Sequence, residues 1–139
     1  MVEAKLKWTG GLRFEGRSLF GHPIATDAAR AAGGTENGYK PTELVLFGLA
    51  GCTGIDVAQI LKKMRQEVTG MEIEVKGYQP EEHPKPFNKI EVRYIFRGKN
   101  LDKNKIEQAI NLSEEKYCSV SQTLKGMARI TSTYEIHEE

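Results

Sequence analysis

The chain has 139 residues, a length that suits one domain with a real hydrophobic core. Its 20 lysines and arginines against 19 aspartates and glutamates give a net charge of +1, a balance that indicates neither a nucleic-acid-binding face nor an acidic tail. Two cysteines are too few for a disulfide scaffold, so we expect a single domain over 1–139 that does not bind nucleic acid.

Short strands are predicted at the N-terminal end. Residues 2–8 alternate between apolar and polar side chains, which is typical of a half-buried strand. After the turn at 9–11, residues 12–19 are predicted to pair with that strand as a hairpin, and 24–26 to form a short third strand. The segment 28–39 is rich in alanine and glycine, and we expect a loop there.

The most apolar stretch of the chain predicts a long helix over 41–67. Pro41 suits the first turn, where its missing N–H costs nothing, and Gly70 is a plausible stop beyond the end. Apolar residues occupy every side of this helix, which indicates burial in a core or between subunits. The uncharged part, 44–55, is too short to span a bilayer. With no signal-peptide core either, we expect a cytoplasmic protein without a membrane partner.

The C-terminal half continues with strands and helices. We predict, in order, a strand at 71–78, a proline-containing loop at 80–86, a strand at 90–96, a helix from 101 to about 117, a helical turn at 119–126 and a strand at 128–136. The two strands around the loop are expected to form a second hairpin. The order βββ-α-ββ-α-β predicts an α+β fold with helices packed on antiparallel sheet.

Three glycines, Gly48, Gly51 and Gly54, recur at every third position of the predicted long helix. Each costs about 1 kcal/mol relative to alanine inside a helix, so their presence needs a reason. One reason is close approach by another backbone. The other is that they clear space around Cys52, because Gly48 falls on the same helix face as this cysteine and Gly51 lies beside it. Both readings stay open.

The two cysteines, Cys52 and Cys118, each lie on or beside a predicted helix. They are either two small buried apolar side chains or a peroxidatic thiol with its resolving thiol. In the second case Cys52 becomes a sulfenic acid on attacking a peroxide, and Cys118 condenses with it to a disulfide. The three histidines match no metal-ligand spacing, so we expect no metal site.

A reactive thiolate needs a positive charge nearby, and the sequence around Cys52 does not supply one. Asp56 lies one turn further along the helix, where its negative charge opposes a thiolate. Glu43 lies nine residues before the cysteine, half a turn away around a straight helix. The cation must then come from elsewhere in the fold or from a partner chain. The candidates are Arg13, Arg17 and Lys116, each of which could equally be a solvated surface charge.

The segments 41–52 and 113–120 resemble the two cysteine motifs of the OsmC/Ohr family, the osmotically inducible and organic-hydroperoxide-resistance proteins, with the greatest likeness to its YhfA-like branch. The resemblance implies an OsmC-like α+β fold with antiparallel sheets, a long buried central helix and an intertwined homodimer with two active sites at the subunit interface. It also implies that Cys52 attacks the hydroperoxide substrate and that Cys118 resolves it. No cofactor is implied, and the Ohr branch is re-reduced by a dithiol, a dihydrolipoyl protein.

The charged partners known in the Ohr branch match this chain less well than the cysteines do. Their arginine follows a Gly-Gly turn, and Arg13 lies closest to that place, displaced by Leu12. Their glutamate stands ten residues before the cysteine, where this chain has Thr42, and Glu43 is one step off. We predict Arg13 and Glu43 as site residues beside the two cysteines.

Two functions therefore remain open. The first is a thiol-dependent peroxidase, an antioxidant oxidoreductase of the oxidative stress response. The second is a redox sensor or small-ligand-binding protein that has the OsmC fold and both thiols but no efficient turnover. Thr42 and Asp56 favour the second function.

Overall fold

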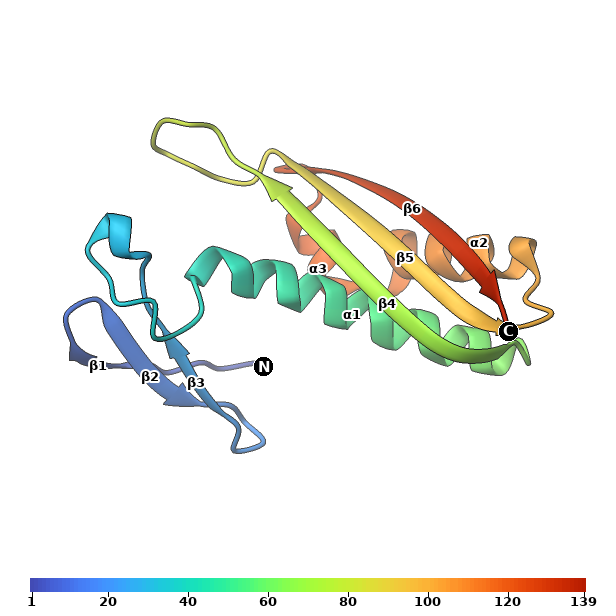
Figure 1. Ribbon diagram of the computed structural model, residues 1–139, viewed down its shortest axis with the longest axis horizontal. Coiled ribbons are helices and arrows are strands. Elements are labelled where there is room, and N and C mark those ends of the chain that lie inside the picture. The colour runs from blue at the N-terminus through green and yellow to red at the C-terminus, as the bar shows by residue number, and fades with distance from the viewer. The chain divides into compact units, whose positions relative to one another are not determined.

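The computed structural model describes all residues, 1–139, and divides into two compact units. The N-terminal unit is Met1–Val45, and the C-terminal unit is Leu46–Glu139. The long helix α1, Pro41–Lys63, begins in the first and continues into the second (Figure 1). The expectation of a single domain over the whole chain stays a prediction.

The N-terminal unit contains a three-stranded antiparallel sheet in the order β1-β2-β3. Its elements are β1 (Lys7–Gly10), β2 (Arg13–Arg17), β3 (Pro23–Thr26) and a 3₁₀ turn (Arg30–Ala32). All three predicted strands are present, but the first begins at Lys7 rather than Val2. Gly10 and Gly11 have φ of 113° and 56°, which is the left-handed region that glycine enters at no steric cost, so the hairpin turns where the sequence predicted.

The predicted loop after β3 is organised around one buried carboxylate, that of Asp27. It accepts hydrogen bonds from the Thr35 hydroxyl (2.5 Å) and from the backbone N–H groups of Ala28 (2.7 Å), Asn37 (3.2 Å) and Thr35 (3.3 Å). These bonds, the one from the Thr35 hydroxyl first, lower the pKa of Asp27 to about 2. The carboxylate therefore stays ionised and fixes the course of the loop.

The C-terminal unit contains a second three-stranded sheet, in the order β4-β5-β6. Its strands are β4 (Glu67–Tyr78), β5 (Lys89–Lys99) and β6 (Arg129–Glu138). β4 and β5 form the predicted antiparallel hairpin. β6, however, runs parallel to β5, so the prediction of purely antiparallel sheet is wrong here. The connection between them is long and helical, which is the kind of crossover that a parallel pair requires.

That crossover contains α2 (Lys103–Leu112), a π-helical turn (Ser113–Tyr117) and α3 (Ser119–Leu124). The helix predicted over 101–117 thus begins two residues later and changes its winding before it ends. Asp102 caps it, because its side chain accepts the Asn104 backbone N–H at 2.8 Å. The predicted turn at 119–126 is present as α3.

Helix α1 begins at Pro41 as predicted but ends at Lys63, four residues early. Arg65 has φ of 58°, and the Gln66 N–H donates to the Leu61 carbonyl (3.0 Å), which together form a Schellman stop. Gly70 is not the stop. It lies within β4, where the pairing register shifts and leaves a bulge.

The core of the C-terminal unit lies between its sheet and its helices, which cover one face of that sheet (Figure 1). The buried residues of α1 are Leu49, Thr53, Val57 and Leu61, each four positions after the last. They pack against inward side chains of β5 and α2, namely Ile90, Val92, Tyr94, Phe96, Ile106, Ala109 and Ile110. Only one stripe of α1 is therefore covered within the chain.

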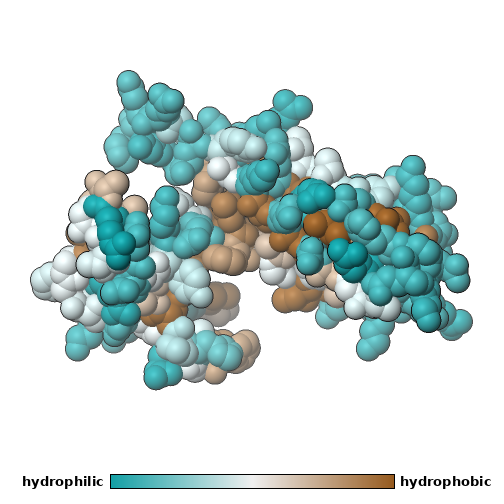
Figure 2. Space-filling view, viewed as in Figure 1, coloured by the Kyte–Doolittle hydropathy of each residue, from teal (hydrophilic) through white to brown (hydrophobic).

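The rest of α1 presents apolar side chains at the surface (Figure 2). Phe47 is 57% exposed and Ile55 63% exposed. Within the chain the predicted burial holds for one stripe, because a helix lying on a sheet turns one side toward it. Burial of the remaining apolar side between subunits stays a prediction. By length and composition alone α1 could cross a membrane, a criterion that core helices of soluble proteins also meet.

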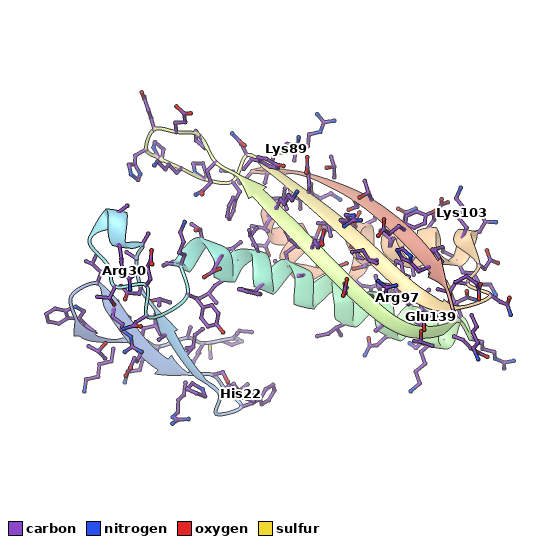
Figure 3. All side chains as sticks on the ribbon, in the orientation of Figure 1. His22, Arg30, Lys89, Arg97, Lys103 and Glu139 are labelled. Carbon is purple, nitrogen blue, oxygen red and sulfur yellow. The ribbon has the colours of Figure 1, made fainter.

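The other face of the C-terminal sheet is charged. Arg93 on β5 pairs with Glu74 on β4 and Glu135 on β6, each at 2.9 Å. Charged side chains cover this face in Figure 3, where Lys89 and Arg97 mark the two ends of β5. The sheet is thus apolar toward the helices and polar toward solvent, as the alternation of its strands predicts.

Candidate active site

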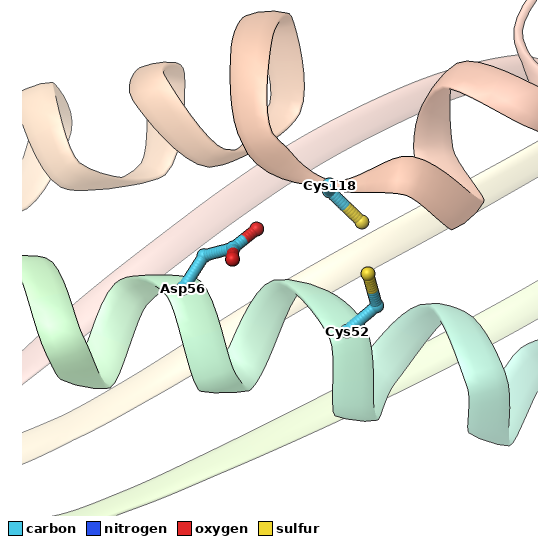
Figure 4. A group of neighbouring side chains, drawn as sticks. All are labelled: Cys52, Asp56 and Cys118. Carbon is cyan, nitrogen blue, oxygen red and sulfur yellow. The ribbon is translucent and has the colours of Figure 1, made fainter.

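The two cysteines face each other across the helical side of the C-terminal unit (Figure 4). Cys52 lies on α1, and Cys118 lies between the π-helical turn and α3. Both are free thiols. Their sulfur atoms and a carboxylate oxygen of Asp56 all lie within 4.8 Å of one another. The structure therefore brings together the two thiols that the sequence places 66 positions apart.

The two thiols differ in their surroundings. Cys118 is fully buried, and this burial raises its pKa to about 11. A hydrogen bond from the Ser121 N–H opposes that shift, and the neighbouring Cys52 and Asp56 add to it. Cys52 is half-buried. Cys118 is thus a neutral thiol near pH 7, and Cys52 is the less buried of the two residues.

The backbone holds Cys118 in place. Its N–H donates to the Ser113 carbonyl at 2.7 Å, which closes the π-helical turn. Its sulfur accepts the Ser121 N–H at 3.4 Å, which makes Cys118 the N-cap of α3. One residue thereby ends one helical segment and caps the next.

The glycines of α1 divide between the two explanations given for them. A Cβ added to Gly54 would meet the Ile73 side chain of β4 at 3.0 Å, so close packing accounts for this glycine. A Cβ added to Gly48 or Gly51 would have no heavy atom within 4 Å. These two leave open space on the part of α1 that contains Cys52, which agrees with the second explanation.

A chain of buried hydroxyl groups leads away from Asp56. The Ser113 hydroxyl donates to Asp56 Oδ2 at 3.0 Å and lies 2.8 Å from the Thr53 hydroxyl. The Thr53 hydroxyl lies 2.8 Å from the Tyr94 hydroxyl, which in turn donates to Glu114 Oε1 at 3.2 Å. The three hydroxyl-bearing residues are each at most 1% exposed. A carboxyl beside the cysteines is thus linked to a second carboxyl through three groups shielded from water.

Sequence reasoning missed this chain. Burial raises the pKa of Tyr94 well above its ordinary value, so its hydroxyl stays protonated. At the far end Glu114 also accepts a hydrogen bond from the Ser132 hydroxyl of β6. A signal was available, since alternation along β5 turns Tyr94 inward, where a hydroxyl needs a partner. Ser113 and Glu114 also open the second cysteine motif.

The predicted charged site residues both lie in the N-terminal unit. Arg13 Nε donates to the Asn37 carbonyl at 3.0 Å, and its Nη1 pairs with Glu15. Glu43 Oε1 accepts the Lys40 N–H at 2.9 Å, which is half of a capping box at the start of α1. Glu43 therefore stabilises the start of α1. Participation of Arg13 and Glu43 in the cysteine chemistry stays a prediction.

The two other candidate cations have contacts of their own. Arg17 Nη1 donates to the Gly21 carbonyl at 2.8 Å. Lys116 Nζ lies 5.3 Å from the centre of the Tyr117 ring. Neither of these contacts involves a sulfur atom, and a role for either residue at the thiols stays a prediction.

Two thiols and one carboxylate are donors that a divalent metal such as zinc can take. Closed structural zinc sites have four protein ligands, and the cluster of Cys52, Asp56 and Cys118 offers three. The Ser113 hydroxyl is already hydrogen-bonded to Asp56. We assign no metal to this cluster, and the expectation of no metal site stays a prediction.

Comparison with known proteins gives one family match. The model of the family described as OsmC-like protein matches residues 34–133, which include both cysteines. Among curated proteins, Protein YhfA of Escherichia coli (strain K12) is 37% identical over 135 residues, covering 97% of this chain and 98% of the relative.

Solved structures share the fold. A hypothetical protein from Aquifex aeolicus VF5 superposes with a TM-score of 0.88 at 34% identity, over 100% of this chain and 98% of that one. The organic hydroperoxide resistance protein OhrB of Bacillus subtilis superposes with a TM-score of 0.66 at 25% identity, over 96% and 98% of the two chains. The α+β arrangement of two small sheets and a long helix is therefore a known one.

Proposed function

This chain belongs to the family of OsmC-like proteins, and from that premise we propose that it is a thiol-dependent hydroperoxide reductase. The family includes hydroperoxide resistance proteins, such as the B. subtilis relative. The observation that carries the proposal is the pair of free thiols, Cys52 and Cys118, whose sulfur atoms lie within 4.8 Å of each other. Such a pair can pass between dithiol and disulfide.

The reaction begins at Cys52. Its thiolate attacks one oxygen of the hydroperoxide, so that an S–O bond forms, the O–O bond breaks and an alcohol leaves after gaining a proton. The sulfur loses two electrons and becomes a sulfenic acid. The thiol of Cys118 then condenses with it, so that an S–S bond forms and water leaves. A dithiol reductant, such as a lipoyl protein, restores both thiols by disulfide exchange, and no cofactor takes part.

The surroundings of the two cysteines support this division of roles. Cys52 is half-buried, next to the bare positions Gly48 and Gly51, so a substrate can approach it. Cys118 is fully buried and has its pKa raised to about 11, so it stays a neutral thiol until the sulfenic acid forms. A resolving thiol that does not react first with peroxide suits this sequence of steps.

The proposal includes a homodimer in the cytoplasm, with Arg13 as the cation that favours the Cys52 thiolate. The exposed apolar side of α1, with Phe47 and Ile55, supports association with a second copy. Arginine suits the cationic role better than lysine, because its planar group can hold a sulfur and a peroxide oxygen together.

A redox sensor or small-ligand-binding protein without efficient turnover is the second candidate. The position of Asp56 favours it, because an ionised carboxylate within 4.8 Å of both sulfur atoms opposes a thiolate. In such a protein the disulfide would form slowly and would report on the oxidant rather than remove it.

The experiment counts free thiols after one equivalent of cumene hydroperoxide. We expect the wild type to lose two thiols rapidly and Cys52→Ser to lose none. Cys118→Ser should lose one thiol in a single turnover and carry a sulfenic acid at Cys52 that dimedone traps. The Cys52→Ser protein is the matched control, because it retains Cys118 alone.

Two results would change the assignment. Slow loss of both thiols in a folded wild type supports the sensor. Full steady-state turnover of Cys118→Ser with a dithiol removes Cys118 as the resolving residue.

A further inference from the structure

The hydroxyl chain beside the cysteines contains too few hydrogen atoms for its contacts. It joins Asp56 to Glu114 through Ser113, Thr53 and Tyr94, with four oxygen–oxygen contacts of 2.8 to 3.2 Å. Each contact needs one hydrogen, and each hydroxyl supplies one. Ionised carboxylates supply none. Three hydrogens therefore have to serve four hydrogen bonds.

The shortage falls on Thr53 when both carboxylates are ionised. Ser113 then donates to Asp56, and Tyr94 donates to Glu114. The single hydrogen of Thr53 is left to serve both Ser113 and Tyr94, each at 2.8 Å. Ser113 and Tyr94 are 0% exposed and Thr53 is 1% exposed, so water cannot fill the gap.

We propose that Asp56 and Glu114 share one extra proton through this chain, and that it rests on Asp56 as a proton store for the cysteines. With the proton there, Asp56 donates to Ser113, and each hydroxyl donates to the next, ending at Glu114. All four contacts then hold a hydrogen. The negative charge then lies on Glu114. This carboxylate accepts hydrogen bonds from both Ser132 and Tyr94, which stabilise it as an anion.

A protonated Asp56 removes the main objection to a reactive Cys52. A neutral carboxyl does not repel a thiolate, whereas a carboxylate within 4.8 Å does. The acidic residue on this turn of α1 thereby becomes compatible with peroxide chemistry. It also becomes a donor placed beside the reacting sulfur.

The role of the stored proton rests on the proposed function. When Cys52 attacks the hydroperoxide, the leaving alkoxide takes the proton of Asp56 and departs as an alcohol. The resulting carboxylate accepts the proton of the Cys118 thiol, whose sulfur then attacks the sulfenic acid. Asp56 returns that proton to the leaving hydroxide, which becomes water. The dithiol reductant supplies two protons with its two electrons, one for Cys118 and one for Asp56.

Infrared spectroscopy of the protein labelled with ¹³C at the aspartate carboxyl groups tests the shared proton without any substrate. We expect the wild type at neutral pH to show the carbonyl band of a protonated aspartic acid, and Asp56→Asn to lack it. Tyr94→Phe should also lack it, because the remaining two hydroxyls then serve two contacts with an ionised Asp56. Absence of the band in the folded wild type overturns the proposal.

Tyr134→Phe is the matched control. The Tyr134 hydroxyl donates to Glu107 Oε1 at 2.6 Å, so this variant also removes a tyrosine hydroxyl from a carboxylate, but outside the chain. Its band should equal that of the wild type. If Tyr134→Phe also lost the band, the loss would result from general loosening of the fold, and the proposal would be overturned.

The transfer role is tested by the rate of disulfide formation after one equivalent of cumene hydroperoxide. Positioned acid–base groups contribute roughly 10²–10⁴-fold, so Asp56→Asn should slow this step by about a hundredfold. Tyr94→Phe should slow it by about tenfold and change its solvent isotope effect, whereas Tyr134→Phe should do neither. An unchanged rate in Asp56→Asn overturns the transfer role. A wild type that does not react with the hydroperoxide overturns the proposed function, and the infrared band still decides the shared proton.

Discussion

The two units of this molecule are each stabilised by a different kind of interaction. In the N-terminal unit, residues 1–45, only Thr26 and Asp27 are buried, and both are polar. The C-terminal unit contains every buried apolar residue of the chain. One unit is thus organised by hydrogen bonds around an ionised carboxylate and the other by an apolar core. A unit of 45 residues with no buried apolar side chain has little core of its own, so we expect another surface to cover it.

The two buried or half-buried aspartates show the same contrast. Asp27 accepts four hydrogen bonds, three of them from backbone N–H groups, and is fixed as an anion. Asp56 is linked to one hydroxyl and lies beside two sulfur atoms. The first carboxylate supports structure, whereas the second is the one for which we propose a shared proton.

The oligomeric state is the first test of this difference between the two units. Large apolar side chains are exposed in the N-terminal unit, namely Leu6, Trp8, Leu12, Phe14, Leu19 and Phe20. Exposed apolar side chains in this number favour an interface, and we expect light scattering at micromolar concentration to show a homodimer. A stable, folded monomer at that concentration would contradict the expectation.

Two phenylalanines then compare the units directly. Phe96 on β5 is 0% exposed, so Phe96→Ala should lower the free energy of unfolding by about 3–5 kcal/mol. Phe14 on β2 is 38% exposed, so Phe14→Ala should cost less than about 1 kcal/mol in a monomer. Urea unfolding at two protein concentrations measures both. If a second copy covers Phe14, the cost of Phe14→Ala rises with concentration while that of Phe96→Ala does not. Equal costs for both variants would remove the contrast.

The N-terminal unit is also predicted to serve the chemistry of the other. Arg13→Ala should slow the reaction of Cys52 with cumene hydroperoxide roughly ten- to a hundredfold, about 1.4–2.7 kcal/mol of barrier, because a cation favours the thiolate. Arg17→Ala is the control and should do much less. The second-order rate constant of Cys52 oxidation measures both. Equal rates for Arg13→Ala and the wild type would favour the sensor.

The smallest effect concerns acid stability. Hydrogen bonds lower the pKa of Asp27 to about 2, against about 4 in an unfolded chain. The stability that this carboxylate contributes is therefore fully present above pH 4 and is lost as the pH falls toward 2. NMR of the 27–39 amides should show this loss, and Asp27→Asn should abolish the pH dependence. The exposed Glu36, in Glu36→Gln, is the control that should leave it unchanged.

The sequence predicted most elements and both hairpins, but not how the last strand pairs. Alternation along residues 90–96 placed a strand correctly, yet the same alternation suits a parallel or an antiparallel neighbour, so the parallel β6 could not be read from it. Gly70 was a plausible helix stop by residue type. The chain instead stops the helix at Arg65, a residue that rarely adopts a left-handed backbone and so gives no signal.

The cysteine pair was predictable, whereas its surroundings were not. Both thiols stood out by residue type and by the motifs around them. Ser113 and Thr53 are common in helices as solvated or core residues, and only the folded chain shows that they meet across 60 positions. Proximity between distant segments is set by tertiary packing, which local periodicity does not contain.

The capping of α3 by Cys118 makes the start of this short helix sensitive to the proposed oxidation of Cys118. In the dithiol form the Cys118 sulfur accepts the Ser121 N–H. Once that sulfur is bonded to Cys52, it turns toward α1 and becomes a poorer acceptor, so α3 loses its cap, an interaction typically worth about 1 kcal/mol for an oxygen cap. The first turn of α3 should then fray. Faster amide hydrogen exchange at Ser121 in the oxidised protein would demonstrate this fraying. A partner molecule could then distinguish the oxidised from the reduced protein by the conformation of this helix end.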